Sequence, residues 1–231
     1  FEGWIGMFPS VDLVNEYEVR DTDGTAKDWN QSSFYKSWQQ NGGYVSDAIY
    51  KNRDNRFYVT VVQDSSRFFN SLVTMRTKGN MHWDSKAGGD WGMALNGYVY
   101  RKGIYTAKPL LNSDPTYYHY VVLRLGRSYL NYAEVMLRQG NISTAIEYIN
   151  KTRTVHGAMP ELPLNLSSEL AWKAYKRERR IELVHEGDRY WSLLRWGKAD
   201  KKDKVEELTK VHHAISISED GKGFEIIPLP Y

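Results

Sequence analysis

The sequence predicts a mainly helical protein with a loop-rich first part and a few short strands. Two observations lead to this prediction. Apolar residues recur at helical spacing from about residue 120 onward, whereas turn-forming residues interrupt the first half throughout. In addition, the chain has 231 residues, of which 41% are hydrophobic, and this is enough to bury a sizeable core. We therefore expect a helical body that carries irregular segments.

The loop-rich part is predicted to span residues 1–116. Its turn signals are Asp23-Gly24, Asn41-Gly42-Gly43, Lys78-Gly79-Asn80 and Gly88-Gly89-Asp90. Long helices are not expected between them. The segment Arg56–Val62 is rich in β-branched and aromatic residues and predicts a strand, and a second strand is predicted over Tyr98–Tyr100.

The helical part is predicted to span residues 117–231 and to form one domain together with the first part. It begins with two helices joined by Gly140-Asn141. The first, over residues 120–139, has the apolar stripe Val122, Leu125, Tyr129, Tyr132 and Met136. The second has the stripe Ile142, Ala145, Ile146 and Ile149 and ends before Pro160 and Pro163. So short a connection predicts a helical hairpin.

This hairpin is similar to a single tetratricopeptide repeat. Gly140 and Ala145 have the separation of the repeat's turn glycine and its following alanine, and three further positions match in part: Tyr129, Ala133 and Ile149. One repeat cannot bury its own face. We therefore expect partner repeats in a preceding region of a longer protein, or a replacement by the loop-rich part.

Three further segments are expected after the hairpin. Ser167-Ser168 are good N-cap residues and predict a helix that runs to Glu186 and stops at Gly187. Residues 190–196 predict a short apolar helical segment, and residues 198–210 a solvated helical one. The prolines in residues 226–230 predict an extended end.

Composition excludes several classes of protein. The chain has no Cys, which excludes disulfides, thiolate metal sites and a cysteine nucleophile. The net charge of +3 is small for a nucleic-acid-binding protein, so no nucleic-acid partner is expected. No apolar run approaches the roughly 20 residues of a membrane-spanning helix, and the first residues lack the order of a signal peptide. The first residue of this sequence is expected to lie within a longer protein.

The densest motif is Lys176-Arg177-Glu178-Arg179-Arg180-Ile181-Glu182-Leu183-Val184-His185-Glu186-Gly187-Asp188-Arg189-Tyr190-Trp191-Ser192-Leu193-Leu194-Arg195-Trp196-Gly197. It resembles the C-terminal signature of the SusD/RagB family of nutrient-binding surface lipoproteins. Residues 123–134 and the segment Asp54-Asn55-Arg56-Phe57-Tyr58 resemble further family segments, the latter a strand start. The chain departs from the family pattern at Gly126-Arg127, His185 and Ser192.

The resemblance implies a tetratricopeptide-like α-α superhelix and a function. It implies non-catalytic binding of glycan or oligosaccharide at the surface of the bacterial outer membrane, and delivery to a SusC-like TonB-dependent transporter. Membrane attachment would use only an N-terminal lipid that this chain does not include, and no cofactor is implied. Two alternatives remain: a peptide-binding member of the family, and a tetratricopeptide-type scaffold for protein partners.

Glu178 and Glu182 lie one helical turn apart and invite comparison with a glycosidase pair, since retaining enzymes hold their carboxyl groups about 5 Å apart. Nearby arginines argue against catalysis because positive charge lowers a carboxyl pKa, whereas a general acid needs a raised one. These arginines are Arg177, Arg179, Arg180 and Arg189. We therefore interpret Glu178, Arg179, Glu182 and Arg189 as a structural signature with ion pairs, and predict no enzymatic activity.

No metal site is predicted. The six His are scattered and lack the spacing of metal ligands on a helix. The acidic segment Asp21–Asp28 does not meet the spacing of an EF-hand loop and predicts a plain turn.

The candidate ligand-binding residues are aromatic. Trp29, Trp38, Trp83 and Trp91 lie in Gly-rich and Asn-rich segments, where an exposed ring can stack on the apolar face of a sugar while neighbouring polar groups bond its hydroxyls. The alternative for each ring is that it holds its loop to the body. Residues 81–98 are the first candidate because they combine two of these rings with polar residues: Asp84, Lys86, Asp90 and Asn96. By contrast, Trp172, Trp191 and Trp196 are predicted to be core residues.

Overall fold

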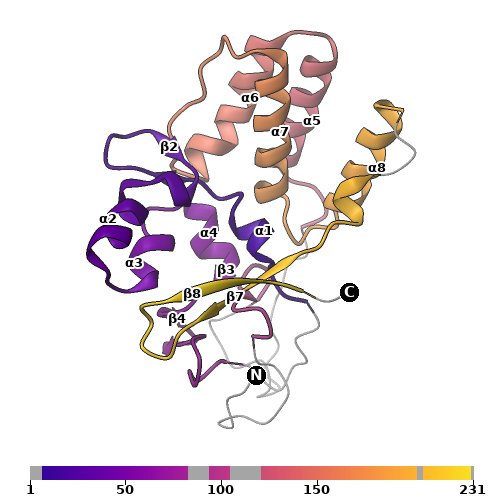
Figure 1. Cartoon of the computed structure of the whole chain (residues 1–231). Coiled ribbons are helices and arrows are strands. Elements are labelled where there is room, and N and C mark those ends of the chain that lie inside the picture. Colours follow the sequence, from indigo (N-terminus) through magenta and orange to yellow (C-terminus); the bar gives the residue numbers. More distant parts are fainter. Residues whose placement is uncertain (1–6, 83–93, 105–120, 202–204, 230–231) are drawn as a thin grey trace.

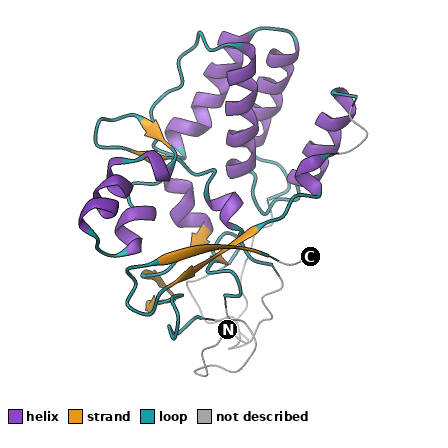
Figure 2. Ribbon diagram, viewed as in Figure 1, coloured by secondary structure: helices purple, strands orange, loops and turns teal. Residues whose placement is uncertain are grey.

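The computed structural model describes residues 7–82, 94–104, 121–201 and 205–229. It is mainly helical, with three long helices at one end and short helices and two-stranded ribbons at the other (Figure 1, Figure 2). The helices are α1 (Val11–Val14), α2 (Ser33–Asn41), α3 (Val45–Ile49), α4 (Asn55–Thr60), α5 (Leu125–Arg138), α6 (Ile142–Val155), α7 (Ser168–Glu182) and α8 (Arg189–Ala199). The predicted fold class is confirmed.

The strands form antiparallel pairs. The pairs are β1 (Val19–Arg20) with β2 (Ala26–Lys27), β3 (Val61–Val62) with β6 (Val99–Tyr100), β4 (Ser66–Phe68) with β5 (Ser71–Val73), and β7 (His213–Ile217) with β8 (Phe224–Pro228). The prediction of an extended C-terminal segment is confirmed by β8, which pairs with β7 in the register Ile215↔Ile226. This ribbon runs below the small helices in Figure 1.

The predicted hairpin is confirmed by α5 and α6, which pack side by side (Figure 1). The stripe of α6 is also confirmed, since Ala145, Ile146 and Ile149 are completely buried. The stripe predicted for α5 is wrong, because Leu125 is 63% exposed and Tyr132 is 43% exposed. The helix begins at Leu125 and instead buries Leu130, Ala133 and Leu137 in one cluster with Ala145. The small alanines let the two helices approach closely.

The start of α7 is confirmed, because the Ser167 hydroxyl accepts a hydrogen bond from the Leu170 backbone N–H at 3.3 Å. The helix ends at Glu182, four residues before the predicted end. His185 then adopts a left-handed conformation with φ of 62°, which turns the chain into α8. The helical prediction for residues 198–210 is wrong, since α8 stops at Ala199. Within the described residues 205–210, the helical structure is limited to the 3₁₀ turn Glu206–Leu208. Its dense charges leave no apolar face to bury.

The strand predicted at Arg56–Val62 is a helix for most of its length. Asp54 caps α4, because its carboxylate accepts a hydrogen bond from the Arg56 backbone N–H at 2.9 Å. This cap outweighs the strand preference of the residues that follow. Only Val61–Val62 is extended, and it pairs with β6, which confirms the strand predicted near Tyr98–Tyr100.

The described residues form three buried clusters, and the two largest lie in different parts of the molecule. One cluster is in the α5–α6–α7 body and includes Ile149 and Tyr175. The other combines the short helices of the first part with Ile181 and Ile215 of the second. The division at residues 116 and 117 stays a prediction.

Candidate functional site

The candidate site is an aromatic surface made by Tyr35 and Trp38 of α2 and Phe224 of β8. The Ser32 hydroxyl caps α2 by accepting a hydrogen bond from the Tyr35 backbone N–H at 3.2 Å. Residues three apart on a helix share one face. The Tyr35 and Trp38 rings are therefore neighbours, with centroids 5.7 Å apart and planes only 20° apart. The Phe224 ring lies 5.6 Å from Trp38.

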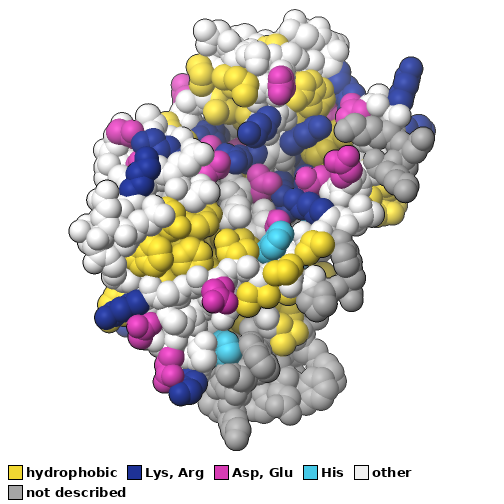
Figure 3. All heavy atoms as spheres, viewed as in Figure 1, with side chains coloured by type: hydrophobic (Ala, Val, Ile, Leu, Met, Phe, Trp, Pro, Cys, Tyr) yellow, Lys and Arg dark blue, Asp and Glu magenta, His cyan; other side chains and the backbone are white. Residues whose placement is uncertain are grey.

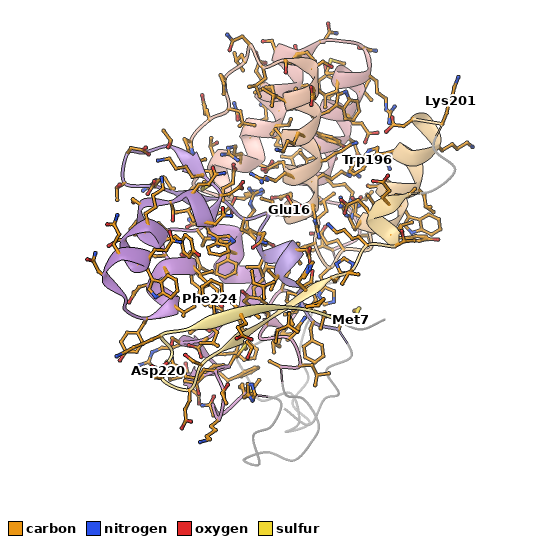
Figure 4. All side chains as sticks on the ribbon, in the orientation of Figure 1. Met7, Glu16, Trp196, Lys201, Asp220 and Phe224 are labelled. Atoms are coloured by element: carbon orange, nitrogen blue, oxygen red, sulfur yellow. The ribbon has the colours of Figure 1, made fainter. Side chains whose placement is uncertain are left out.

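This aromatic surface is partly exposed. Its three side chains pack against the core of the short helices without being fully covered. Figure 3 shows a hydrophobic patch between α2 and β8, and Figure 4 places Phe224 on β8 beside α2 and α3. The arrangement leaves aromatic groups at the surface on a rigid framework.

Trp38 is fixed by the turn that follows α2. Its indole N–H donates to the Gly43 carbonyl at 3.0 Å. Gly42 and Gly43 have φ of 69° and 121°, conformations that side chains rarely adopt, so glycine is needed here. The ring is therefore oriented before any ligand arrives, which lowers the entropic cost of binding.

Polar groups adjoin the aromatic surface. Asn41 lies one turn after Trp38 on α2 and is exposed. Tyr44 is 51% exposed just after the glycine turn. Rings with adjacent amide and hydroxyl groups can stack on a sugar and bond its hydroxyls.

Trp29 requires a correction, because we expected an exposed ring. It is only 7% exposed, and its indole N–H donates to the Asn15 side-chain oxygen at 2.7 Å. Its ring meets Tyr35 edge to face at 4.9 Å. Trp29 therefore supports the aromatic surface from the core side.

Trp83 and Trp91 lie outside the described residues, as do Asp84, Lys86 and Asp90. They stay predicted ligand residues. Asn96, the remaining polar residue of that segment, is 5% exposed and donates from its amide to the Pro9 carbonyl at 2.8 Å. The Asn96 side chain therefore holds two parts of the chain together at this point.

The three tryptophans of the signature region differ in burial. Trp196 is 4% exposed, which confirms the prediction of a core residue, and Trp172 packs partly buried against the same cluster. Trp191 is 67% exposed, so that prediction is wrong. It lies on the side of α8 opposite the buried Leu193 and Trp196.

The family motif builds a buried ion-pair cluster of Arg56, Arg124, Glu178 and Glu182. The Arg56 guanidinium pairs with Glu178 and lies 2.9 Å from Glu182. Arg124 pairs with Glu182 as well. Asp54 adds a third carboxylate, 2.6 Å from Arg56. The cluster therefore joins the start of α4 to the end of α7.

Ion pairing of Glu178 and Glu182 is confirmed, but the predicted partners are wrong. Arg177 and Arg180 pair with Glu16, Arg179 pairs with Asp188, and Arg189 pairs with Glu207. On α7, the first three of these arginines point away from the face of the two glutamates, and Arg189 lies on α8. The actual partners come from α4 and from the segment before α5, far away in the sequence.

The cluster holds Glu182 ionised. Burial alone would raise its pKa, but hydrogen bonds and charge from Arg124 and Arg56 outweigh burial and lower the pKa to about 2. Glu134, also buried, has its pKa lowered to about 2 by hydrogen bonds from Arg195, Tyr175 and Arg138 that outweigh desolvation. A carboxylate with so low a pKa cannot serve as a general acid near neutral pH.

Stability is expected to fall in acid because of these two glutamates. The folded pKa of each is about 2, below the 4.5 of an unperturbed Glu. Their stabilising contribution is thus complete above pH 4.5 and is lost as the pH falls toward 2, on the order of a few kcal/mol. Urea unfolding between pH 6 and pH 2.5 measures this loss. A Glu147→Gln variant, altered at an exposed carboxylate of α6, should show the same pH profile as the wild type. A constant urea midpoint would contradict the ion-pair assignment.

Two absences hold for residues 7–82, 94–104, 121–201 and 205–229 alone. Within these ranges, no group of three His, Cys, Asp or Glu side chains could hold a metal ion. The described helices include none that is both long enough and apolar enough to cross a membrane. The turn predicted at Asp21–Asp28 is confirmed, and the Asp21 carboxylate accepts from Lys27 at 2.7 Å.

Comparison with known proteins identifies the family. The family model described as the SusD family matches residues 1–219. A SusD-like protein from Bacteroides fragilis NCTC 9343 has a similar structure, with a TM-score of 0.73 and 23% identity over 99% of this chain and 42% of its own. A SusD-like carbohydrate binding protein from the same strain has a TM-score of 0.59 and 22% identity over 89% of this chain and 37% of its own.

The chain thus spans less than half the length of both of these structures. No curated protein matches the sequence. The family model covers nearly the whole chain, and the solved structures share its fold. The chain belongs to the SusD family.

Proposed function

We propose that this chain binds glycan or oligosaccharide without cleaving it, and that the aromatic surface of Tyr35, Trp38 and Phe224 contacts the sugar. The observation that carries the proposal is the pair of nearly parallel rings on α2, fixed by a cap and a glycine turn and flanked by exposed polar groups. Membership of the SusD family supports it. One structure that the chain resembles is described as a SusD-like carbohydrate binding protein.

Trp83 and Trp91 are proposed as further ligand residues. Their segment is followed by Asn96, which is anchored to Pro9, and by β6. A second pair of rings would let the protein contact more than one sugar of a chain, and linked contacts raise the overall affinity.

The absence of cleavage is proposed from the chemistry of the signature carboxylates. Glu182 has a lowered pKa and lies 3% exposed among arginines. A glycosidase needs one carboxyl group that is protonated at its working pH. The signature glutamates therefore serve folding in this proposal.

At the level of the cell, we propose that the protein is a surface lipoprotein of the outer membrane that delivers its ligand to a SusC-like TonB-dependent transporter. This part of the proposal rests on the resemblance of the signature and on family membership. Co-purification of the full-length protein with a transporter from its own membrane would support it. A full-length protein that fractionates away from the outer membrane would contradict it.

The proposal is tested by electrophoresis of the chain through gels that contain single polysaccharides, with reducing-sugar release assayed in parallel. We expect retardation by at least one glycan and no release of sugar. Trp83→Ala and Trp91→Ala variants, run beside it, test the two further residues and should be less retarded. Failure to bind any glycan would contradict the proposal and favour a peptide ligand, and release of sugar would contradict the non-catalytic part.

A further inference from the structure

A cavity of about 440 Å³ lies where the end of α7 and the start of α8 meet β6 and the segment before β7. It shares no residue with the aromatic surface. Its volume falls within the range of pockets that hold small molecules. Nothing in the proposed function uses this cavity, which we name the arginine pocket after Arg180 and Arg189.

Two arginines and two histidines are among the residues that line the arginine pocket. Arg180 and Arg189 contribute guanidinium groups, and His185 and His212 contribute imidazoles. Figure 3 shows basic side chains interspersed with acidic ones, and a histidine beside them, between α8 and the β7–β8 ribbon. Among the described residues that line the pocket, Asp188 supplies the one carboxylate.

That carboxylate is already engaged. One Asp188 oxygen lies 2.7 Å from Arg179 and 2.9 Å from Arg127. The other accepts from Arg179 at 2.8 Å and from the Ser192 hydroxyl at 2.8 Å. Asp188 therefore pairs with Arg127 and Arg179, neither of which lines the pocket, and its charge is already compensated there.

Arg180 and Arg189 keep donors for a ligand. Arg180 pairs with Glu16 at 2.6 Å, and Arg189 pairs with Glu207 at 3.2 Å. Neither glutamate lines the arginine pocket. A guanidinium carries five N–H donors, so one carboxylate contact leaves others available. Burial first, and then the charge of Arg180, lowers the pKa of Arg189, and the charges of Glu207 and Glu16 offset only part of this lowering. An anion between the two guanidinium groups would counter the remaining effect of Arg180.

The remaining walls are aromatic. The Tyr100 and His185 rings stack with centroids 4.7 Å apart and planes 18° apart. Tyr190, which is 53% exposed, lines the pocket from α8. Flat side chains beside a pair of guanidinium groups suit a ligand that has a ring and an anionic substituent.

We propose that the arginine pocket binds a sugar that carries a carboxylate, such as a hexuronate unit of an acidic glycan. The carboxylate lies between Arg180 and Arg189, and the sugar ring lies against the Tyr100–His185 stack. That the ligand carries a negative charge is inferred from the pocket itself. That the ligand is a sugar rests on the proposed function.

The test is titration calorimetry at pH 7 and low salt with trigalacturonate and with its methyl ester, which has the same rings without the charge. We expect the acid to bind and the ester to bind at least about tenfold more weakly, a difference of about 1.4 kcal/mol. Arg189→Gln should weaken binding of the acid by about the same factor. Arg67→Gln, at an exposed residue of β4 with the same change of charge, should not change it.

Three outcomes would overturn the inference. The acid and its ester could bind equally well, acetate alone could bind as tightly as trigalacturonate, or Arg67→Gln could weaken binding as much as Arg189→Gln. His212→Gln is a second variant of the pocket lining, chosen because this side chain is 45% exposed. The melting temperatures of all variants show whether weaker binding results from a loss of folding. Trp38→Ala separates failure of this inference from failure of the proposed function. This variant should still bind trigalacturonate, even if no neutral glycan binds to the aromatic surface.

Discussion

Replacing Arg56 by Met is expected to lower the free energy of unfolding by about 3–5 kcal/mol, the usual cost of breaking a buried ion pair from one side. Arg56 is only 6% exposed and contacts three carboxylates, those of Asp54, Glu178 and Glu182. Met fills a similar volume but leaves these charges without their shared partner. Urea or thermal unfolding of the wild type and the variant measures the loss.

Two further variants make the result specific. Arg56→Lys keeps one charge but loses the planar fork that reaches several carboxylates at once, so an intermediate loss is expected. Arg67→Met makes the same substitution at an exposed residue of β4 and should change stability by less than about 0.5 kcal/mol. If Arg56→Met were as stable as Arg67→Met, the ion-pair cluster would not be what joins α4 to α7.

Replacing Trp38 by Ala is expected to weaken glycan binding by about 30-fold, because truncation of a central aromatic anchor typically costs about 2 kcal/mol or more. Trp38 contacts both other rings of the aromatic surface, and its indole is held by Gly43. Affinity for a retained oligosaccharide, measured by titration calorimetry, checks this prediction.

The matched control is Trp191→Ala. This residue is 67% exposed on α8, so the variant also removes an exposed indole but does so away from the aromatic surface. Its affinity should equal that of the wild type. Trp38→Phe should retain most of the affinity because a ring remains. A loss in Trp191→Ala with none in Trp38→Ala would place the sugar on α8.

Local signals predicted the elements that depend on neighbours in the sequence. The stripe of α6 and the Ser167 cap of α7 were predicted correctly because both are set by spacing within one helix. The α4 helix was missed because strand propensity was weighed without the Asp54 cap. The predictions of a buried α5 stripe and a buried Trp191 failed for a different reason. Apolar spacing identifies one face of a helix, but it does not show whether another part of the chain packs against that face.

The candidate site was only partly predictable for a related reason. Trp38 was found from its loop-like surroundings, and Tyr35 could have been found from its helical spacing to Trp38. Phe224 reaches the site only through the β7–β8 ribbon, which pairs residues far from α2 in the sequence. In the same way, 122 positions separate Arg56 from Glu178, and no local pattern connects them.

The aromatic surface is tested most directly by a crystal structure of the chain with an oligosaccharide that it retains. Our account predicts an intact ligand with a sugar ring within about 4 Å of the Trp38 indole, in contact with Tyr35 or Phe224. Sugar bound elsewhere, with the Tyr35–Trp38–Phe224 surface empty, would contradict the proposed site. A cleaved oligosaccharide would contradict the proposal of capture without catalysis.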